Sequence, residues 1–179
     1  MSLTKFTSIT GTCVPVPGPD MDTDRIIPSR FLKCITFDEL AGVMFWDERF
    51  DENGQSKSHP VDDPRFKGAS IILGGSNFGC GSSREQAPEI IKALGISCVI
   101  AKSFARIFFR NSINNGLLLI EQPDLHDDIK EGDAITVKMN EHVDYNGKTY
   151  PIAALPENLM DIIQAGGLVK AMRKRNGLD

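Results

Sequence analysis

The sequence is poor in histidine and contains no closely spaced cysteines. Its three histidines lie in polar segments, and its four cysteines lie far apart with no C-x-x-C pair: Cys13, Cys34, Cys80 and Cys98. Zinc and iron–sulfur sites built from a single chain usually draw on clustered cysteine and histidine ligands. The spacing therefore argues against a metal centre built from this chain alone and favours reduced, mostly buried thiols.

Long apolar runs and an excess of positive charge are also missing. The longest apolar runs, such as Leu117–Ile120, are far too short to cross a bilayer, and residues 1–6 lack the apolar core of a signal peptide. The net charge of −4 gives no electrostatic basis for binding nucleic acid or an anionic membrane. We therefore expect a cytoplasmic protein of one domain, spanning residues 1–179, without nucleic-acid or membrane partners.

Strand and helix patterns alternate in the middle of the chain. Apolar strands are predicted at Ala69–Leu73, Ser97–Ala101 and Leu117–Ile120. Helical patterns over Glu85–Leu94 and Phe104–Asn115 separate them. This βαβαβ order predicts a parallel sheet with right-handed crossovers.

The two ends of the chain show other patterns. Ser8–Val16 has the composition of a strand, and Ala134–Met139, the Asn146-Gly147 turn and Thr149–Ile152 predict a small antiparallel layer. Two helices follow, over Glu157–Ala165 and up to Arg173–Arg175. We interpret the basic end of the last helix as complementing the helix dipole rather than as a binding patch.

Residues between the first strand and the central pattern predict one helix and a long loop. Thr36 can cap a helix that runs through Leu40 toward Phe45. Asp47–Arg65 is rich in turn residues, so we expect an irregular loop there. Over the wider stretch Met44–Arg65, we expect few side chains to enter the core. Loops of this length in a compact domain are usually functional lids or disordered.

The most informative stretch is Asn77–Gln86, with the sequence NFGCGSSREQ. It joins a predicted strand to a predicted helix, so its backbone N–H groups and the positive end of the helix dipole can bind a carboxylate, a phosphate or an oxyanion. Gly79 and Gly81 permit a left-handed backbone and close approach to a ligand. Arg84 carries a planar fork that matches a carboxylate.

From these residues alone, a purely structural role for this stretch is as plausible as a role in ligand binding. Ser83 and Gln86 fit a capping box, and Arg84 can form an ordinary salt bridge. The phosphate-loop, G-x-G-x-x-G and G-x-S-x-G patterns are absent. Few histidines are available as a base, which argues against a serine hydrolase.

Five motifs, in a consistent order, resemble a known family. Gly79–Pro88, Ala101–Ile107 (AKSFARI) and Asn111–Gly116 (NSINNG) resemble the swivel domain of the aconitase superfamily. Asp22–Pro28 (DTDRIIP) and Met44–Phe50 (MFWDERF) are similar to the bacterial small-subunit family of 3-isopropylmalate dehydratases. The resemblance implies an α/β fold, a three-layer β/β/α swivelling domain with a mainly parallel sheet and a smaller antiparallel layer.

The resemblance also implies an activity and a partner. Members of this family are subunits of a two-chain hydro-lyase of leucine biosynthesis, which interconverts the dicarboxylates 2-isopropylmalate and 3-isopropylmalate by dehydration and rehydration. A separate large dehydratase subunit carries a [4Fe–4S] cluster, so no cofactor is expected on this chain. One iron of that cluster acts as a Lewis acid. Related alternatives are a dehydratase of homoaconitate or a methyl-substituted malate, and a non-catalytic swivel module that binds a carboxylate or a protein.

The resemblance assigns roles within the glycine-rich stretch. Ser82 matches the catalytic serine of the family, which acts as an alkoxide base. Ser83 and Arg84 match residues that hold a substrate carboxylate. A serine alkoxide needs fixed N–H dipoles and nearby cations, and a glycine turn at a helix N-terminus can supply them.

One departure and one further loop bear on the substrate. Aconitases place another substrate-binding arginine where this chain has Val16–Asp20 without arginine, which argues against aconitase itself. By resemblance, Phe45 and Trp46 offer apolar surface to an isopropyl group, or Arg49 grips a carboxylate. For Trp46, a core or interface position is an equally open alternative. We expect this loop to order over the substrate when the large subunit docks.

Overall fold

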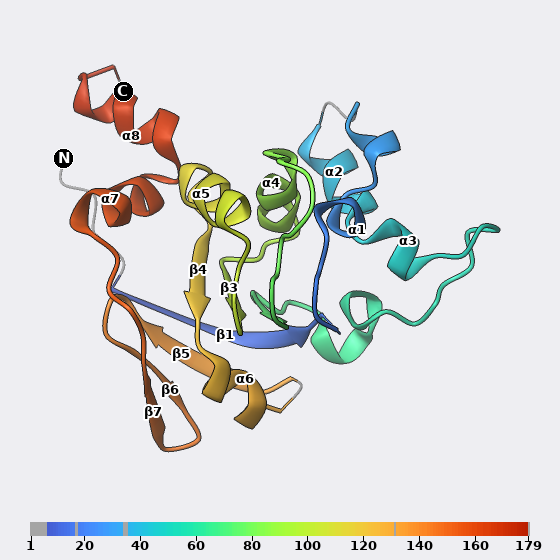
Figure 1. Cartoon of the computed structure of the whole chain (residues 1–179), viewed down its shortest axis with the longest axis horizontal. Helices are drawn as coiled ribbons and strands as arrows, with labels where there is room; N and C mark the ends of the chain where they lie inside the picture. Colours follow the sequence, from blue (N-terminus) through green and yellow to red (C-terminus); the bar gives the residue numbers. More distant parts are fainter. Residues whose placement is uncertain (1–6, 17, 34–35, 131, 179) are drawn as a thin grey trace.

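All strands of the described chain belong to one curled sheet. The computed structural model describes residues 7–16, 18–33, 36–130 and 132–178. Within them, seven strands follow the spatial order β4-β3-β2-β1-β5-β6-β7. Figure 1 shows the sheet with β1 running across its centre.

One half of the sheet is parallel, as the βαβαβ pattern predicts. Its strands are β1 (Ser8–Pro15), β2 (Ile71–Gly74), β3 (Cys98–Ala101) and β4 (Leu118–Glu121). Each pairs in parallel with the next. The crossovers are α4 (Gln86–Ala93) and α5 (Arg106–Asn114).

The other half is antiparallel. It consists of β5 (Ala134–Lys138), β6 (His142–Tyr145) and β7 (Lys148–Pro151), in consecutive pairing. Asn146 and Gly147 both have positive φ, 48° and 76°, which confirms the predicted hairpin turn. β1 pairs with β2 on one edge and with β5 on the other, so it belongs to both halves.

Two hydrophobic cores make the fold three-layered. On one face of the parallel strands, side chains such as Ile72 and Val99 pack against Ile90 of α4 within one cluster. On the opposite face, Ile71 and Cys98 belong to a second cluster that includes the antiparallel strands. Figure 1 shows α4 and α5 on one side of the parallel strands and β5–β7 on the other. This arrangement confirms the predicted β/β/α fold class.

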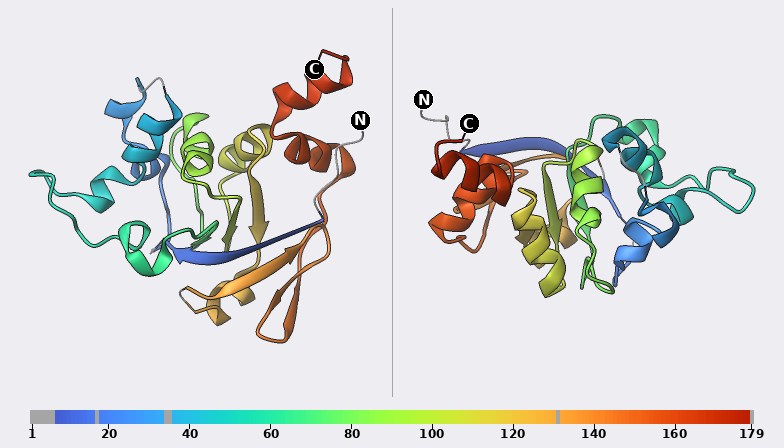
Figure 2. Two further views of the ribbon diagram at one scale, coloured as in Figure 1. Left: turned by 180° about the vertical axis from the view of Figure 1, so that it is seen from behind. Right: turned by 90° about the horizontal axis from the view of Figure 1, so that it is seen from above.

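Shorter elements complete the chain. The remaining helices are α1 (Thr23–Ile26), α2 (Phe37–Val43), α3 (Trp46–Arg49), α6 (Pro123–Asp128), α7 (Glu157–Ala165) and α8 (Leu168–Arg175), with 3-10 turns at Ser29–Phe31, Pro60–Asp62 and Pro64–Phe66. Thr36 caps α2, as predicted, and its partner in a capping box is Glu39. In Figure 2, α1–α3 and α7–α8 lie at opposite ends of the molecule. Among the described residues, no helix is long and apolar enough to cross a membrane.

The segment after α2 agrees only in part with the sequence prediction. Few of its side chains enter the core, as predicted, since Met44, Phe45 and His59 are the buried residues within 44–65. The predicted loop is not wholly irregular, because it contains α3 and the last two 3-10 turns. Phe45 adopts a left-handed backbone with φ 52°, and its N–H donates to the Ile26 carbonyl at 2.9 Å. This unusual turn directs the ring inward, which the loop-like composition does not reveal.

Candidate active site

The glycine-rich loop Gly75–Glu85, called the serine loop below, follows β2 at the carboxyl edge of the parallel strands. Gly79 and Gly81 have φ of +80° and +86°. A Cβ on Gly79 would lie 2.1 Å from the Phe108 ring, and one on Gly81 would lie 2.3 Å from an Asp22 carboxylate oxygen. Both the backbone conformation and the close neighbours therefore require glycine.

Residues Met21–Arg25, called the bracing segment, run beside the serine loop. The Gly79 N–H donates to the Met21 carbonyl at 2.7 Å, and the Thr23 N–H donates to the Cys80 carbonyl at 2.8 Å. The Thr23 hydroxyl donates to the Ser82 carbonyl at 2.9 Å. Because Thr23 is 1% exposed, this contact fixes the Ser82 peptide from the interior side.

A second support comes from the segment after β3. The Asn77 N–H donates to Ser103 Oγ at 2.8 Å, and the Asn77 side chain donates to Asp20 Oδ1 at 2.7 Å. Asn77 itself has φ 56°, a conformation that asparagine tolerates. The serine loop is thus held from both of its sides by separate segments.

Ser82 and Ser83 are exposed on the outer side of this loop. Their hydroxyls, and the backbone N–H groups of residues 82–84, make no hydrogen bond within the described part of the chain. The capping box predicted for Ser83 and Gln86 is wrong. The N-cap of α4 is Glu85, which is already in the helical region (φ −67°, ψ −27°) and has no side-chain cap bond. Both hydroxyls and these N–H donors are therefore available to a ligand.

Arg84 is anchored from one nitrogen. Its Nη1 donates to the Ile27 carbonyl at 2.8 Å and lies 2.5 Å from Asp24 Oδ1. The side chain is 12% exposed. The salt bridge that the sequence left open is therefore present. Nε and Nη2 have no hydrogen-bond partner in the described ranges, so part of the fork remains for a carboxylate.

Ion pairs join the neighbouring α3 to this region. Arg25 Nε donates to Glu48 Oε1 at 2.7 Å, and the Arg30 guanidinium forms a two-point pair with Asp47. The hydrogen bond from Arg25 lowers the pKa of Glu48, and that from Arg30 lowers the pKa of Asp47. α3 is thus tied to the bracing segment and to the turn that follows it.

The structure does not bring the predicted residues of α3 to an open site. Phe45 is fully buried, with its ring 5.2 Å from that of His59, so it offers no apolar surface to a ligand here and its substrate contact stays a prediction. Arg49 binds both Asp62 oxygens at 2.8 and 2.6 Å and also donates to the carbonyls of residues 42 and 44. Its donors hold the loop rather than a free ligand site.

Trp46 lies between two other aromatic rings. Its ring centroid is 5.4 Å from that of Phe31 and 4.6 Å from that of Phe50, and the side chain is partly exposed. This packing agrees with the structural alternative for Trp46. Because part of the Trp46 side chain is exposed, its contact with a substrate or with the large subunit stays a prediction.

The sequence reasoning missed three supporting residues. Thr23, Asp24 and Glu48 each contact a residue of the serine loop or bracing segment. The available signal was the Asp22–Pro28 motif, to whose polar residues the resemblance assigned no role.

The thiols of the described residues are mostly buried. Burial raises the pKa of Cys13 to about 12, and it raises the pKa of Cys98 and Cys80. Across the described ranges, no group of three histidine, cysteine, aspartate or glutamate side chains is placed to hold a metal ion. Cys34 lies outside those ranges.

Comparison with known proteins agrees with this geometry. The family model described as the aconitase C-terminal domain matches residues 3–125. The chain is 61% identical to the 3-isopropylmalate dehydratase small subunit of Lachnospira eligens, covering 92% of this chain and 94% of the relative. It is 43% identical to the isopropylmalate/citramalate isomerase small subunit of Methanocaldococcus jannaschii, covering 88% and 90%.

A solved structure shows the same architecture. The crystal structure of the 3-isopropylmalate dehydratase (leuD) of Methanocaldococcus jannaschii matches with a TM-score of 0.78 and 38% identity, covering 96% of each chain. With sequence, domain and fold in agreement, the chain belongs to the 3-isopropylmalate dehydratase small-subunit family, which carries the aconitase C-terminal domain.

Proposed function

We propose that this chain is the small subunit of a cytoplasmic hydro-lyase that interconverts 2-isopropylmalate and 3-isopropylmalate in leucine biosynthesis. The observation that carries the proposal is the exposed Ser82 on a fixed glycine turn, beside unpaired N–H groups and a partly available Arg84. The names of the most similar relatives support the same activity.

In the proposed mechanism, the Ser82 alkoxide removes a proton from the carbon next to a substrate carboxylate. The N–H groups of residues 82–84 and the N-terminus of α4 stabilise its negative charge. Ser83 and the free side of the Arg84 fork bind the carboxylate and orient the C–H bond. In the hydration direction, the Ser82 hydroxyl returns the proton.

The remaining chemistry is assigned to a second chain. Because no group of three histidine, cysteine, aspartate or glutamate side chains in the described ranges is placed to hold a metal ion, we propose that a large subunit supplies the [4Fe–4S] group and the Lewis-acid contribution to hydroxide departure. The site would then form where that subunit covers the exposed serine loop.

A second candidate substrate is a methyl-substituted malate. The Methanocaldococcus relative is named for both isopropylmalate and citramalate. A substrate panel that includes citramalate and homoaconitate therefore belongs in the test. A non-catalytic module would bind the large subunit or a carboxylate without turnover on any member of that panel.

The test is anaerobic purification of this chain with its large subunit, followed by assays with and without that partner. We expect turnover only in the complex. Ser82→Ala should lower kcat by ~10²–10⁴-fold. Ser8→Ala is the matched control, because Ser8 is also exposed but lies on β1. Ser82 is not the base if its alanine variant keeps more than about a tenth of the wild-type kcat, a far smaller loss than removal of a general base causes.

A further inference from the structure

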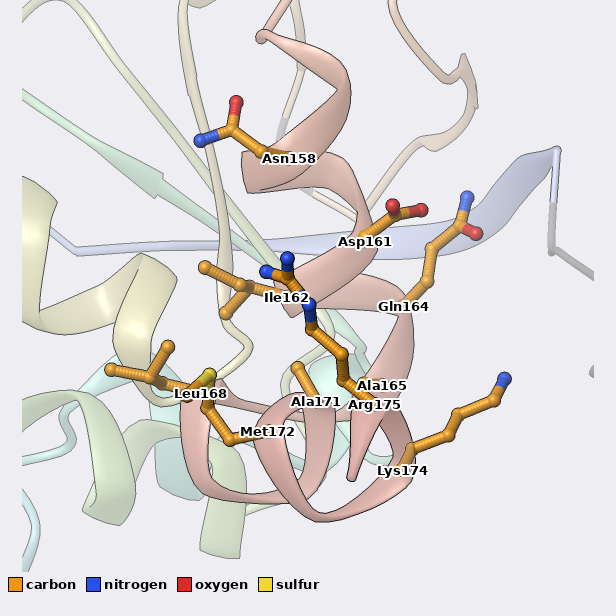
Figure 3. Close-up of a pocket in the computed structure, with 10 residues that line it drawn as sticks. All are labelled: Asn158, Asp161, Ile162, Gln164, Ala165, Leu168, Ala171, Met172, Lys174 and Arg175. Carbon is orange, nitrogen blue, oxygen red and sulfur yellow. The ribbon is translucent and has the colours of Figure 1, made fainter. Parts of the chain in front are cut away.

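A groove lies between the last two helices, away from the serine loop. It has a volume of about 640 Å³. Its apolar lining comes from Ile162 and Ala165 of α7 and from Leu168, Ala171 and Met172 of α8. Figure 3 shows Leu168 and Met172 on the same side as Ile162, with the Arg175 side chain extending between the two helices.

The apolar residues of α8 are unusually exposed. Leu168 is 37% and Met172 is 48% exposed, and of the five exposed large hydrophobics among the described residues, four lie between positions 168 and 178. Residues 168 and 172 are one helical turn apart and share a face. The helix dipole accounts for basic residues in the last turn of α8, but it does not account for exposed leucine and methionine beside them.

The charge on the same helix restricts what can cover the groove. α8 carries four basic residues and no acidic one, although the whole chain has a net charge of −4. Lys174 and Arg175 line the groove together with one acidic residue, Asp161 of α7. The lining is therefore net positive, and a second copy docked through this face would bring two net positive surfaces together, which is unfavourable. The groove suits an acidic segment with apolar side chains.

We propose that the α7–α8 groove, lined by residues 158–175, docks an acidic amphipathic segment of the large subunit. The proposal rests on the proposed two-chain function. Helical grooves with an apolar floor and a charged rim commonly accept such segments. Here Ile162, Leu168 and Met172 would receive the apolar side chains, and Lys174 and Arg175 would pair with the carboxylates.

This contact would be separate from the one that completes the serine loop. The turn between α7 and α8 packs against the turn before β4, where a Cβ on Gly116 would lie 2.5 Å from the Gly166 carbonyl carbon. That turn is at the amino edge of the parallel strands, whereas the serine loop is at their carboxyl edge. Substitutions in the groove should therefore change subunit affinity without changing the chemistry of the assembled enzyme.

The experiment compares two double variants on the same helix. Met172→Ser with Arg175→Glu alters the groove. Val169→Ser with Lys170→Glu is the control, because these two residues are exposed and do not line the groove. For each full-length variant, the dissociation constant for the large subunit is measured anaerobically by calorimetry. kcat is then measured with the large subunit at saturation, and folding is checked by thermal melting.

We expect the groove variant to raise the dissociation constant by about tenfold or more, with kcat at saturation unchanged and the control near wild type. Higher salt should weaken the wild-type complex more than the groove variant's complex. Arg175→Glu alone should produce part of the same loss.

The proposal is overturned if the groove variant binds the large subunit within about twofold of wild type, a change well below one interface contact. It is equally overturned if the substitutions change only self-association or binding to anionic vesicles. In those cases an active wild-type complex leaves the proposed function standing. An inactive wild-type complex would instead contradict the proposed function.

Discussion

Thr23→Val offers a test of how the serine loop is held. The substitution keeps the shape of the side chain but removes the hydroxyl that donates to the Ser82 carbonyl at 2.9 Å. The backbone bond from the Thr23 N–H to Cys80 remains. We therefore expect a loss of about 1 kcal/mol in the free energy of unfolding, within the usual range for one hydrogen bond.

The effect on catalysis should exceed the effect on stability. A reactive group displaced by about 1 Å can lose ~10²-fold in rate, so we expect kcat of the complex to fall by roughly 10- to 100-fold with little change in KM. The assay is consumption of 3-isopropylmalate by the anaerobic complex at saturating large subunit. Thr23→Ser should restore most of kcat, since it restores the donor.

A matched control is Thr10→Val, which removes a Thr10–Thr136 hydroxyl contact of 2.9 Å on β1. A kcat for Thr23→Val within about twofold of wild type, with normal subunit binding, would refute the positioning role, since displacement of the serine predicts a larger loss.

Three further predictions concern neighbouring residues. Arg84→Lys keeps the positive charge near Asp24 but loses the planar fork, so the KM for 3-isopropylmalate should rise by about tenfold. A lower melting temperature with unchanged kinetics would instead favour a purely structural salt bridge. Burial lowers the pKa of His59 below its ordinary value of 6.5, so the unfolded chain binds a proton at this residue more readily than the folded one. His59 therefore stabilises the fold above about pH 6.5, and this contribution to the free energy of unfolding is lost as the pH falls. The wild-type melting temperature should accordingly drop more between about pH 7.5 and 5.5 than that of His59→Gln, and equal drops would contradict this origin. Phe45→Ala should lower the free energy of unfolding by about 3–5 kcal/mol in urea titrations, and a loss below about 1 kcal/mol would show that the cavity collapses at little cost.

The periodicity of the apolar residues predicted most of the fold. Within the predicted apolar runs, Ile71–Leu73 and Cys98–Ala101 are buried on both faces in the structure, as the centre of a parallel sheet requires. Glu157–Ala165 coincides with α7 because its apolar spacing and Gly166 define both the face and the end of the helix. α6 was not predicted, since six mostly polar residues give too short a pattern.

The candidate site was only partly predictable. The local sequence correctly predicted that Ser82 and Ser83 lie on a glycine turn. It did not predict where α4 begins, because that depends on the backbone conformation of Glu85, and Ser83 therefore does not cap the helix. The inward position of Phe45 depends on a positive φ that few bulky residues adopt. The Thr23–Ser82 and Asp24–Arg84 contacts join segments about 60 positions apart, and no local pattern encodes such pairs.

The double pairing of β1 has a consequence for the order in which the protein folds. During synthesis, β1 emerges before β5, yet Ser8 pairs with Lys138 and Thr12 with Ala134 on one of its edges. That edge stays without its native partner until β5 has also left the ribosome. Because such distant pairing closes slowly, the newly made strand is exposed to misassociation for that whole interval. Chaperone dependence and aggregation of nascent chains should therefore depend on residues 134–138, far from the serine loop in sequence.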